Sequence, residues 1–127
     1  MDDVSVADIV SGTVVHDDGR DWLVVESRFG PPPFGFYPPW ELVLMPATGG
    51  TARTLRCTTA RRLCLVPAMT RVMNYVCVQE GELLLLEPET GIVHTLSVTR
   101  TRRVWGSLEP ECVVEVVFHL GQPVWLR

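Results

Sequence analysis

Short apolar runs separated by turn-forming residues recur along almost the whole chain. In the first half they cover residues 10–15, 22–27, 41–45, 52–57 and 62–66, separated by turns such as HDDGRD, PATGG and VPAM. In the second half they read MNYVCVQ, ELLLLE, IVHTLSV, CVVEVVFHL and PVWL. These lengths are typical of strands, and only residues 99–111 leave room for one helical turn. The pattern therefore predicts an all-β protein.

A chain of 127 residues can arrange these strands in two ways. One is a single sandwich, and the other is a pair of small barrels of about sixty residues each, close to the lower limit for independent folding. Periodicity alone does not separate the two arrangements. For two barrels, we expect a boundary near residues 68–71, between a domain of residues 1–69 and a domain of residues 70–127.

The segment 29–40 reads FGPPPFGFYPPW and fits neither a regular strand nor a helix. Proline fixes φ and removes a backbone donor, so the segment predicts a stiff loop. Its side chains are aromatic, whereas solvent-exposed loops are usually polar. Because exposed apolar patches often mark interaction sites, we assign a candidate binding loop here. The alternative is that the rings fold back and cap their own barrel. The candidate binding residues are Pro32, Pro33, Phe34, Gly35, Phe36, Tyr37 and Trp40.

The basic residues are all of one kind. The formal net charge is −4, and all eleven Lys+Arg positions are arginine. The absence of lysine excludes a Schiff-base or P-loop lysine mechanism. Binding to RNA would need a local basic patch against the overall charge. The candidate phosphate contacts are Arg61, Arg62, Arg100, Arg102 and Arg103, and the alternative for each is an ordinary solvated surface position.

No motif for catalysis or metal binding is present in the sequence. The four cysteines and three histidines do not have the spacing of a zinc site, so we expect no metal and no cofactor. There is no nucleophile elbow or phosphate-binding glycine loop. If the chain is an enzyme, His119, Asp21 or Glu41 would serve as acid or base in an apolar pocket covered by the loop. The N-terminus has no signal-peptide core and no run reaches membrane-span length, so we expect a cytoplasmic protein without a membrane partner.

The order of these features resembles a known family. IVSGTVVHDDGRDWLVVES is similar to the family's opening hairpin, and the proline- and glycine-containing loop is followed by a strand that ends on Thr48 and Gly49. In the second half, MNYVCVQEGELLLLEPETG and VEVVFHLGQPVWL are similar to its later strands and closing hairpin. From about Asp8 to Arg127 the chain resembles bacterial elongation factor P and the archaeal and eukaryotic initiation factor 5A proteins.

This resemblance implies a KOW or SH3-like barrel followed by an OB-fold barrel, as in the two-domain relatives. It also implies binding to the ribosome beside the peptidyl-tRNA, with the loop tip directed at the peptidyl-transferase centre to relieve stalling at consecutive prolines. The family tip usually presents a lysine, often modified, or an arginine. A gapless count from the Thr-Gly turn places Phe34 at this position, so the modifiable lysine is absent.

Three functions follow as alternatives. The first is a diverged elongation factor P-like protein associated with ribosome and tRNA, in which Phe34 stacks on a base or sugar. The second is a repurposed two-barrel scaffold that binds a protein or an apolar small molecule through the aromatic loop. The third is a pathway-specific enzyme, for which the sequence offers no assembled catalytic group.

Overall fold

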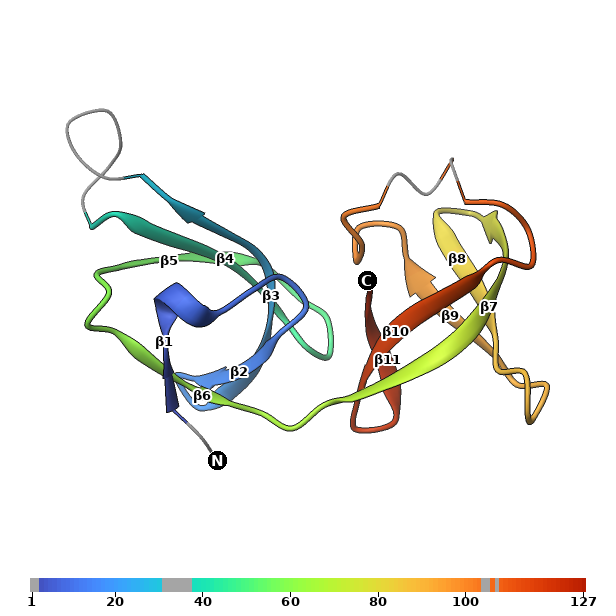
Figure 1. The fold of residues 1–127 in the computed structure, drawn as a ribbon, viewed down its shortest axis with the longest axis horizontal. Helices are drawn as coiled ribbons and strands as arrows, with labels where there is room; N and C mark the ends of the chain where they lie inside the picture. The colour runs from blue at the N-terminus through green and yellow to red at the C-terminus, as the bar shows by residue number, and fades with distance from the viewer. Residues whose placement is uncertain (1–2, 31–37, 104–105, 107) are drawn as a thin grey trace. The chain divides into compact units, whose positions relative to one another are not determined.

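The chain folds into two units, each built on its own β-sheet (Figure 1). The structure, a computed structural model, describes residues 3–30, 38–103, 106 and 108–127. The units are Met1–Pro67 and Ala68–Arg127, so two barrels form rather than one sandwich. The all-β fold class is confirmed. No helix among the described residues is long and apolar enough to span a bilayer.

The N-terminal unit contains a six-stranded antiparallel sheet in the order β1-β6-β2-β3-β4-β5. Its elements are β1 (Asp3–Ser5), a short 3₁₀ helix η1 (Val6–Asp8), β2 (Val14–Asp17), β3 (Arg20–Phe29), β4 (Trp40–Pro46), β5 (Arg53–Cys57) and β6 (Arg62–Leu65). Side chains that alternate inward along the strands form its core, since one face of a strand points to one side of the sheet. The buried core residues are Val6, Ile9, Val15, Trp22, Val24, Leu42, Leu44, Cys57 and Leu63.

The start of this unit differs from the sequence expectation. Residues 10–15 were expected to form one strand, but β2 begins only at Val14. Val10 is 62% exposed, and Gly12 adopts φ 92°, a left-handed conformation that suits glycine and interrupts a strand. The acidic first residues instead form β1 and η1, where the Ser5 hydroxyl accepts a hydrogen bond from the Ala7 amide. This start buries Val6 completely.

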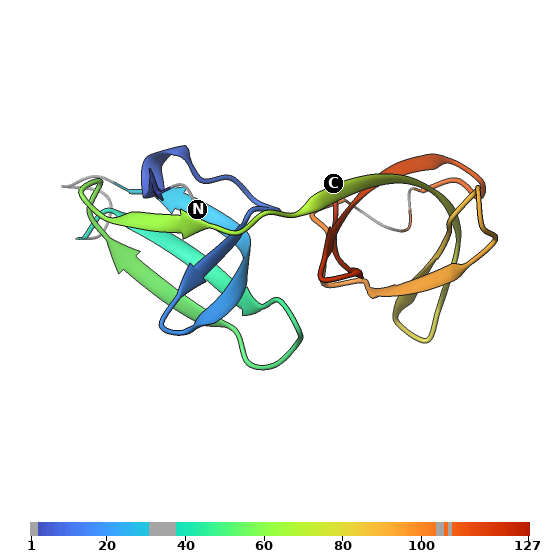
Figure 2. The same ribbon diagram turned by 90° about the horizontal axis from the view of Figure 1, so that it is seen from below.

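The C-terminal unit contains a five-stranded antiparallel sheet in the order β11-β10-β7-β8-β9. Its strands are β7 (Met69–Gln79), β8 (Glu82–Leu86), β9 (Val93–Ser97), β10 (Val113–His119) and β11 (Gln122–Leu126). The register shifts between Tyr75 and Cys77 on β7, and such bulges increase local bending. Figure 2 shows the sheet curled into a ring. Its core residues are Met73, Tyr75, Leu83, Leu85, Leu96, Leu108, Val114, Val116, Phe118 and Leu126.

Two-residue turns close three of the hairpins. Both turn residues have positive φ at Asp18-Gly19, Glu80-Gly81 and Leu120-Gly121. This conformation matches the right-handed twist of the flanking strands, and its second position commonly carries glycine. The sequence HDDGRD thus forms the predicted turn between β2 and β3.

Candidate functional site at the base of the proline-rich loop

The β3–β4 hairpin carries the candidate binding loop. The last residue of β3, Phe29, pairs with the first residue of β4, Trp40. The Gly30 amide donates a hydrogen bond of 2.9 Å to the Pro39 carbonyl, which extends the pairing one step further. The two ends of the loop are therefore held together by the sheet. Six of its predicted binding residues, Pro32, Pro33, Phe34, Gly35, Phe36 and Tyr37, lie outside the described residues.

An aromatic pair forms the base of the loop. The ring centroids of Phe29 and Trp40 lie 4.8 Å apart with an interplanar angle of 35°. Trp40 packs against the core of its unit, whereas Phe29 is 52% exposed. The indole N–H of Trp40 is buried and has no hydrogen-bond partner among the described residues. The core thus fixes Trp40, and Trp40 in turn supports an exposed phenyl ring that another planar group can contact.

A charged row crosses the outer face of the sheet next to this pair. The register places Glu41 of β4 between Arg28 of β3 and Arg56 of β5. The Glu41 carboxylate lies 3.0 Å from Arg28 Nη2 and 3.8 Å from Arg56 Nη2, and Glu41 is only 9% exposed. Arg28 Nε also lies 3.5 Å from Glu26 Oε1. The loop base therefore carries two arginines whose charges are compensated by two carboxylates.

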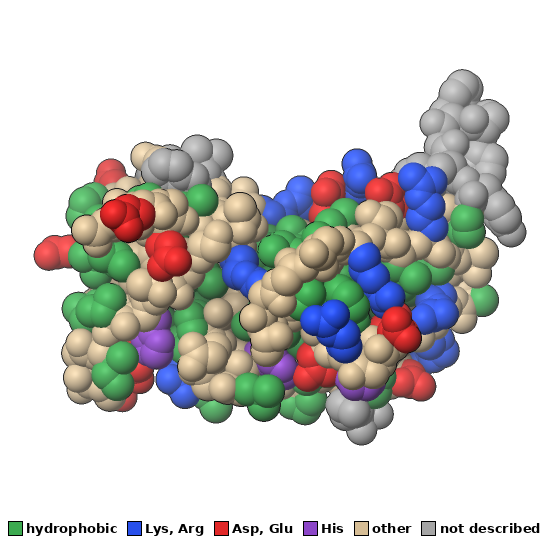
Figure 3. All heavy atoms as spheres, turned by 180° about the vertical axis from the view of Figure 1, so that it is seen from behind, with side chains coloured by type: hydrophobic (Ala, Val, Ile, Leu, Met, Phe, Trp, Pro, Cys, Tyr) green, Lys and Arg blue, Asp and Glu red, His purple; other side chains and the backbone are tan. Residues whose placement is uncertain are grey.

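The two candidate phosphate contacts in the N-terminal unit are also engaged. Arg61 Nη2 lies 2.8 Å from Asp17 Oδ1, and Arg53 pairs with the other oxygen of the same carboxylate. Arg62 Nη2 donates a hydrogen bond of 2.8 Å to the Asp3 carbonyl. Figure 3 shows arginine and acidic side chains of this unit lying next to each other. The unit therefore presents mixed charge rather than a basic stripe.

The other three candidate phosphate contacts belong to the C-terminal unit. Arg100 donates a hydrogen bond of 3.3 Å to the Val124 carbonyl, and burial lowers the pKa of its guanidinium. Arg102 and Arg103 are exposed. The five predicted contacts thus divide between the two units.

The three candidate acid–base residues do not converge within either unit. Asp21 lies near the start of β3, and its carboxylate oxygen Oδ1 is 2.8 Å from Nδ1 of the His16 ring. Glu41 lies at the opposite end of the β3–β4 hairpin, beside the loop. His119 is buried at the end of β10 in the other unit. Among the described residues no group of three or more His, Cys, Asp or Glu side chains is placed to hold a metal ion.

Sequence reasoning missed the residues that compensate charge around the loop. Counting backward and forward from the Phe29–Trp40 pair would have placed Arg28 opposite Glu41, but the pairing itself was not known from the sequence. A second missed cluster lies around Trp22. The Trp22 indole N–H donates a hydrogen bond of 2.9 Å to the Asp17 carbonyl. The Arg53 guanidinium lies 4.4 Å from the centroid of the Trp22 ring.

Comparison with known proteins adds information at the level of the fold. No family model matches the chain, and no curated protein matches it by sequence. Among solved structures, eukaryotic translation initiation factor 5A from Methanococcus jannaschii matches with a TM-score of 0.50 and 17% identity, covering 99% of this chain and 94% of that one. A translation initiation factor eif-5a family protein from Naegleria fowleri ATCC 30863 has a TM-score of 0.46 and 10% identity, covering 99% and 97%.

The first of these matches confirms the predicted architecture. Over almost its whole length the chain has the two-domain fold of the Methanococcus jannaschii structure, an SH3-like barrel followed by an OB-fold. The resemblance that the sequence indicated is thereby confirmed at the level of the fold.

Proposed function

We propose that this protein is a diverged, cytoplasmic factor of the elongation factor P and initiation factor 5A type that associates with the ribosome and its peptidyl-tRNA. The observation that supports the proposal is the likeness of fold to initiation factor 5A over 99% of the chain. A fold by itself does not determine function, because function depends on the site that the fold carries. The β3–β4 hairpin and its loop are that site.

The loop would act through stacking instead of a cation. No lysine exists in the chain, and Phe34 stands at the expected tip. Stacking of an aromatic side chain on a base contributes about 1–3 kcal/mol per base. The Arg28–Glu41–Arg56 row beside the loop is compensated by its own carboxylates, so few counterions would be released there. We therefore expect a ribosome affinity that depends on aromatic rings and falls only weakly with salt.

Co-sedimentation with ribosomes stalled at consecutive prolines tests this proposal. The full chain is expected to pellet with the stalled ribosomes at low salt. The double variant Phe34→Ala, Tyr37→Ala should lose about tenfold in affinity or more, in line with the loss of one to two stacking contacts. Val10→Ala, an exposed position away from the loop, serves as the matched control and should bind as the wild type. Failure of the wild-type chain to pellet would reject the proposal.

One observation favours a second function, a scaffold that binds a protein or an apolar small molecule through the loop. Phe29 is half exposed on top of a core-anchored Trp40, an arrangement that also suits an apolar ligand. Titration with the dye 1-anilinonaphthalene-8-sulfonate separates the two functions. Dye binding that Phe29→Ser abolishes, in a chain that does not pellet with ribosomes, would favour the scaffold.

A further inference from the structure

The outer face of the C-terminal sheet carries an apolar strip that its own unit leaves exposed. One cross-strand row runs from Val113 on β10 through Asn74 and Leu86 to Val93 on β9. Val113 is 64% exposed and Val93 is 54% exposed. Val72 and Val76 flank Asn74 along β7 and are 56% and 39% exposed. The apolar strip consists of Val72, Val76, Leu86, Val93 and Val113.

These side chains are not part of the core of the barrel. Their strand neighbours Met73, Leu85 and Val114 point to the other face and are buried in the core of the unit. An antiparallel sheet with one face in water normally carries polar side chains on that face. Contiguous apolar side chains on an exposed face usually mark a surface that another molecule covers.

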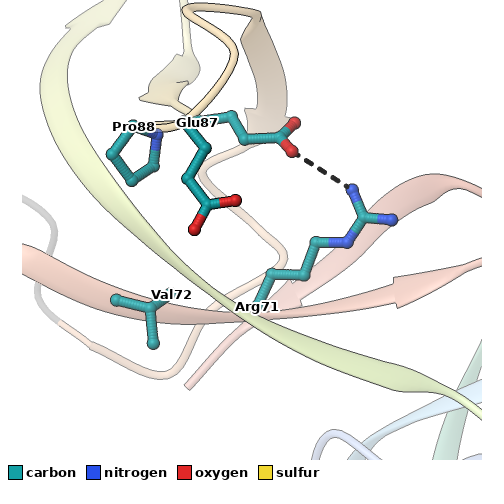
Figure 4. A pocket seen from close by; sticks show the side chains of 5 residues that line it. Arg71, Val72, Glu87 and Pro88 are labelled. Atoms are coloured by element: carbon teal, nitrogen blue, oxygen red, sulfur yellow. Dashed lines mark ion pairs between the residues drawn. The ribbon is translucent and has the colours of Figure 1, made fainter.

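Hollows lie at two places along the strip. One, of about 520 Å³, is lined by Arg71, Val72, Glu87, Pro88 and Glu89 (Figure 4). The other, of about 620 Å³, is lined by Asn74, Tyr75, Val76, Leu86, Pro110 and Glu111. Each is open enough to accept a side chain of a partner that lies along β7.

Carboxylates outnumber arginines around the strip, where Arg71 lines one hollow and the Arg127 amide donates a hydrogen bond to the Glu115 carbonyl. Glu89 and Glu111 line the hollows, and Glu115 lies opposite Val72 on the same face. All three are exposed, and none forms an ion pair within the part of the chain that the structure describes. The one arginine that lines a hollow, Arg71, lies 3.7 Å from the Glu87 carboxylate and stacks over the Phe118 ring. Its charge is therefore compensated, and the three glutamates remain available.

We propose that the apolar strip docks a basic segment of another protein, one that presents apolar side chains with Lys or Arg between them. The apolar side chains would cover the valines, and the cations would meet Glu89, Glu111 and Glu115. RNA does not fit, because its phosphates would face carboxylates and the described strip offers no exposed aromatic ring for stacking. A second copy of the chain would set carboxylates against carboxylates, which is unfavourable. This docking surface is separate from the loop and does not depend on the proposed ribosome function.

Fluorescence anisotropy with the full chain and labelled model peptides tests the proposal. An alternating leucine–lysine peptide is expected to bind, whereas serine–lysine and leucine–glutamate peptides of equal length should bind about tenfold more weakly or worse. Val72→Ser combined with Val113→Ser should weaken the leucine–lysine peptide about tenfold. Leu120→Ser, an 81% exposed site in the turn between β10 and β11, is the matched control and should leave binding unchanged.

A second variant keeps the test independent of apolar substitutions. The triple change Glu89→Gln, Glu111→Gln, Glu115→Gln should also weaken the leucine–lysine peptide and flatten the salt dependence of its binding. Equal affinity of the valine double variant and the wild type would overturn the proposal. So would equal affinity for the serine–lysine peptide, stronger binding of a labelled oligouridine RNA, or a dimer in sedimentation velocity that the valine double variant abolishes. None of these outcomes bears on whether the chain pellets with ribosomes, so the two proposals can fail independently.

Discussion

The two units carry the same formal charge but distribute it in opposite ways. Each has a net charge of −2, from six arginines against eight acids in the N-terminal unit and five against seven in the C-terminal unit. In the N-terminal unit, Arg28, Arg53, Arg56 and Arg61 all lie against carboxylates. In the C-terminal unit, Arg71 lies against Glu87, and the exposed Glu89, Glu111 and Glu115 lie around the apolar strip.

The two units therefore differ in the arrangement of their charges and not in their net charge. Pairing within the N-terminal unit leaves the charges beside the Phe29–Trp40 pair compensated. In the C-terminal unit, Glu89, Glu111 and Glu115 form no ion pair within the described residues and are available to an outside cation.

The largest effects are expected from the two separate cores. Leu42 and Leu85 are both fully buried, one in each core cluster. Replacing either leucine by alanine should lower the free energy of unfolding of its own unit by about 2–5 kcal/mol. In hydrogen–deuterium exchange, Leu42→Ala should reduce protection in β2–β4, and Leu85→Ala should reduce it in β7–β10. Equal loss of protection in both units after either change would show that the cores are coupled.

Much of this fold could be predicted from the sequence because its strands are short, apolar and bounded by strong turn signals. The expected run 62–66 corresponds to β6, and CVVEVVFHL corresponds to β10. The prediction for the start of the chain was wrong, because Gly12 interrupts the expected first strand and β2 begins only at Val14. β1 and η1 were missed, since each is only three residues long.

The surfaces were harder to predict than the strands. Proline content alone located the loop between β3 and β4. The pairing of Arg28 and Arg56 with Glu41 depends on register, which the sequence did not show. Val72 and Val113 are apolar like their buried neighbours Met73 and Val114, so residue type alone does not distinguish the exposed side chains from the buried ones. Their exposure became visible only once the inward face of each strand was known.

A smaller effect is expected from the paired charges at the β2–β3 turn. The Asp17 carboxylate forms ion pairs with both Arg53 and Arg61, and its side chain is 17% exposed. Asp17→Asn should lower the free energy of unfolding by about 1–3 kcal/mol, because two guanidinium groups lose a shared carboxylate. Urea unfolding followed by circular dichroism measures this change.

Two matched carboxylates sharpen that prediction. Asp18→Asn, whose side chain is 79% exposed, should change stability by less than about 0.5 kcal/mol. Glu115→Gln in the C-terminal unit should have an equally small effect, because Glu115 has no ion pair within the described residues. A loss from Glu115→Gln as large as that from Asp17→Asn would contradict the contrast between the units.

The smallest effect concerns one thiol from each unit. Burial raises the pKa of Cys57, partly offset by the nearby Arg61 charge, whereas Cys77 is exposed. A thiolate is the reactive form, so iodoacetamide should label Cys77 well before Cys57 in the folded chain. Because the folded pKa of Cys57 is raised, its contribution to stability is complete below the ordinary thiol pKa of about 8.5 and is lost as the pH rises beyond it. Cys57→Ala should reduce that alkaline loss, which thermal unfolding at rising pH would measure.

The most direct test of the proposed function is a photocrosslink from the loop tip. In this experiment Phe34 is replaced by a photoreactive benzophenone amino acid. The variant is then irradiated with ribosomes that are stalled at consecutive prolines and carry labelled peptidyl-tRNA. If position 34 contacts the tRNA, we expect a crosslink to the 3′ end of that tRNA. The yield of this crosslink should fall when Tyr37→Ala is added and should not change when Val10→Ala is added. A Phe34 crosslink that forms only with protein, or none above the level seen with empty ribosomes, would contradict the account.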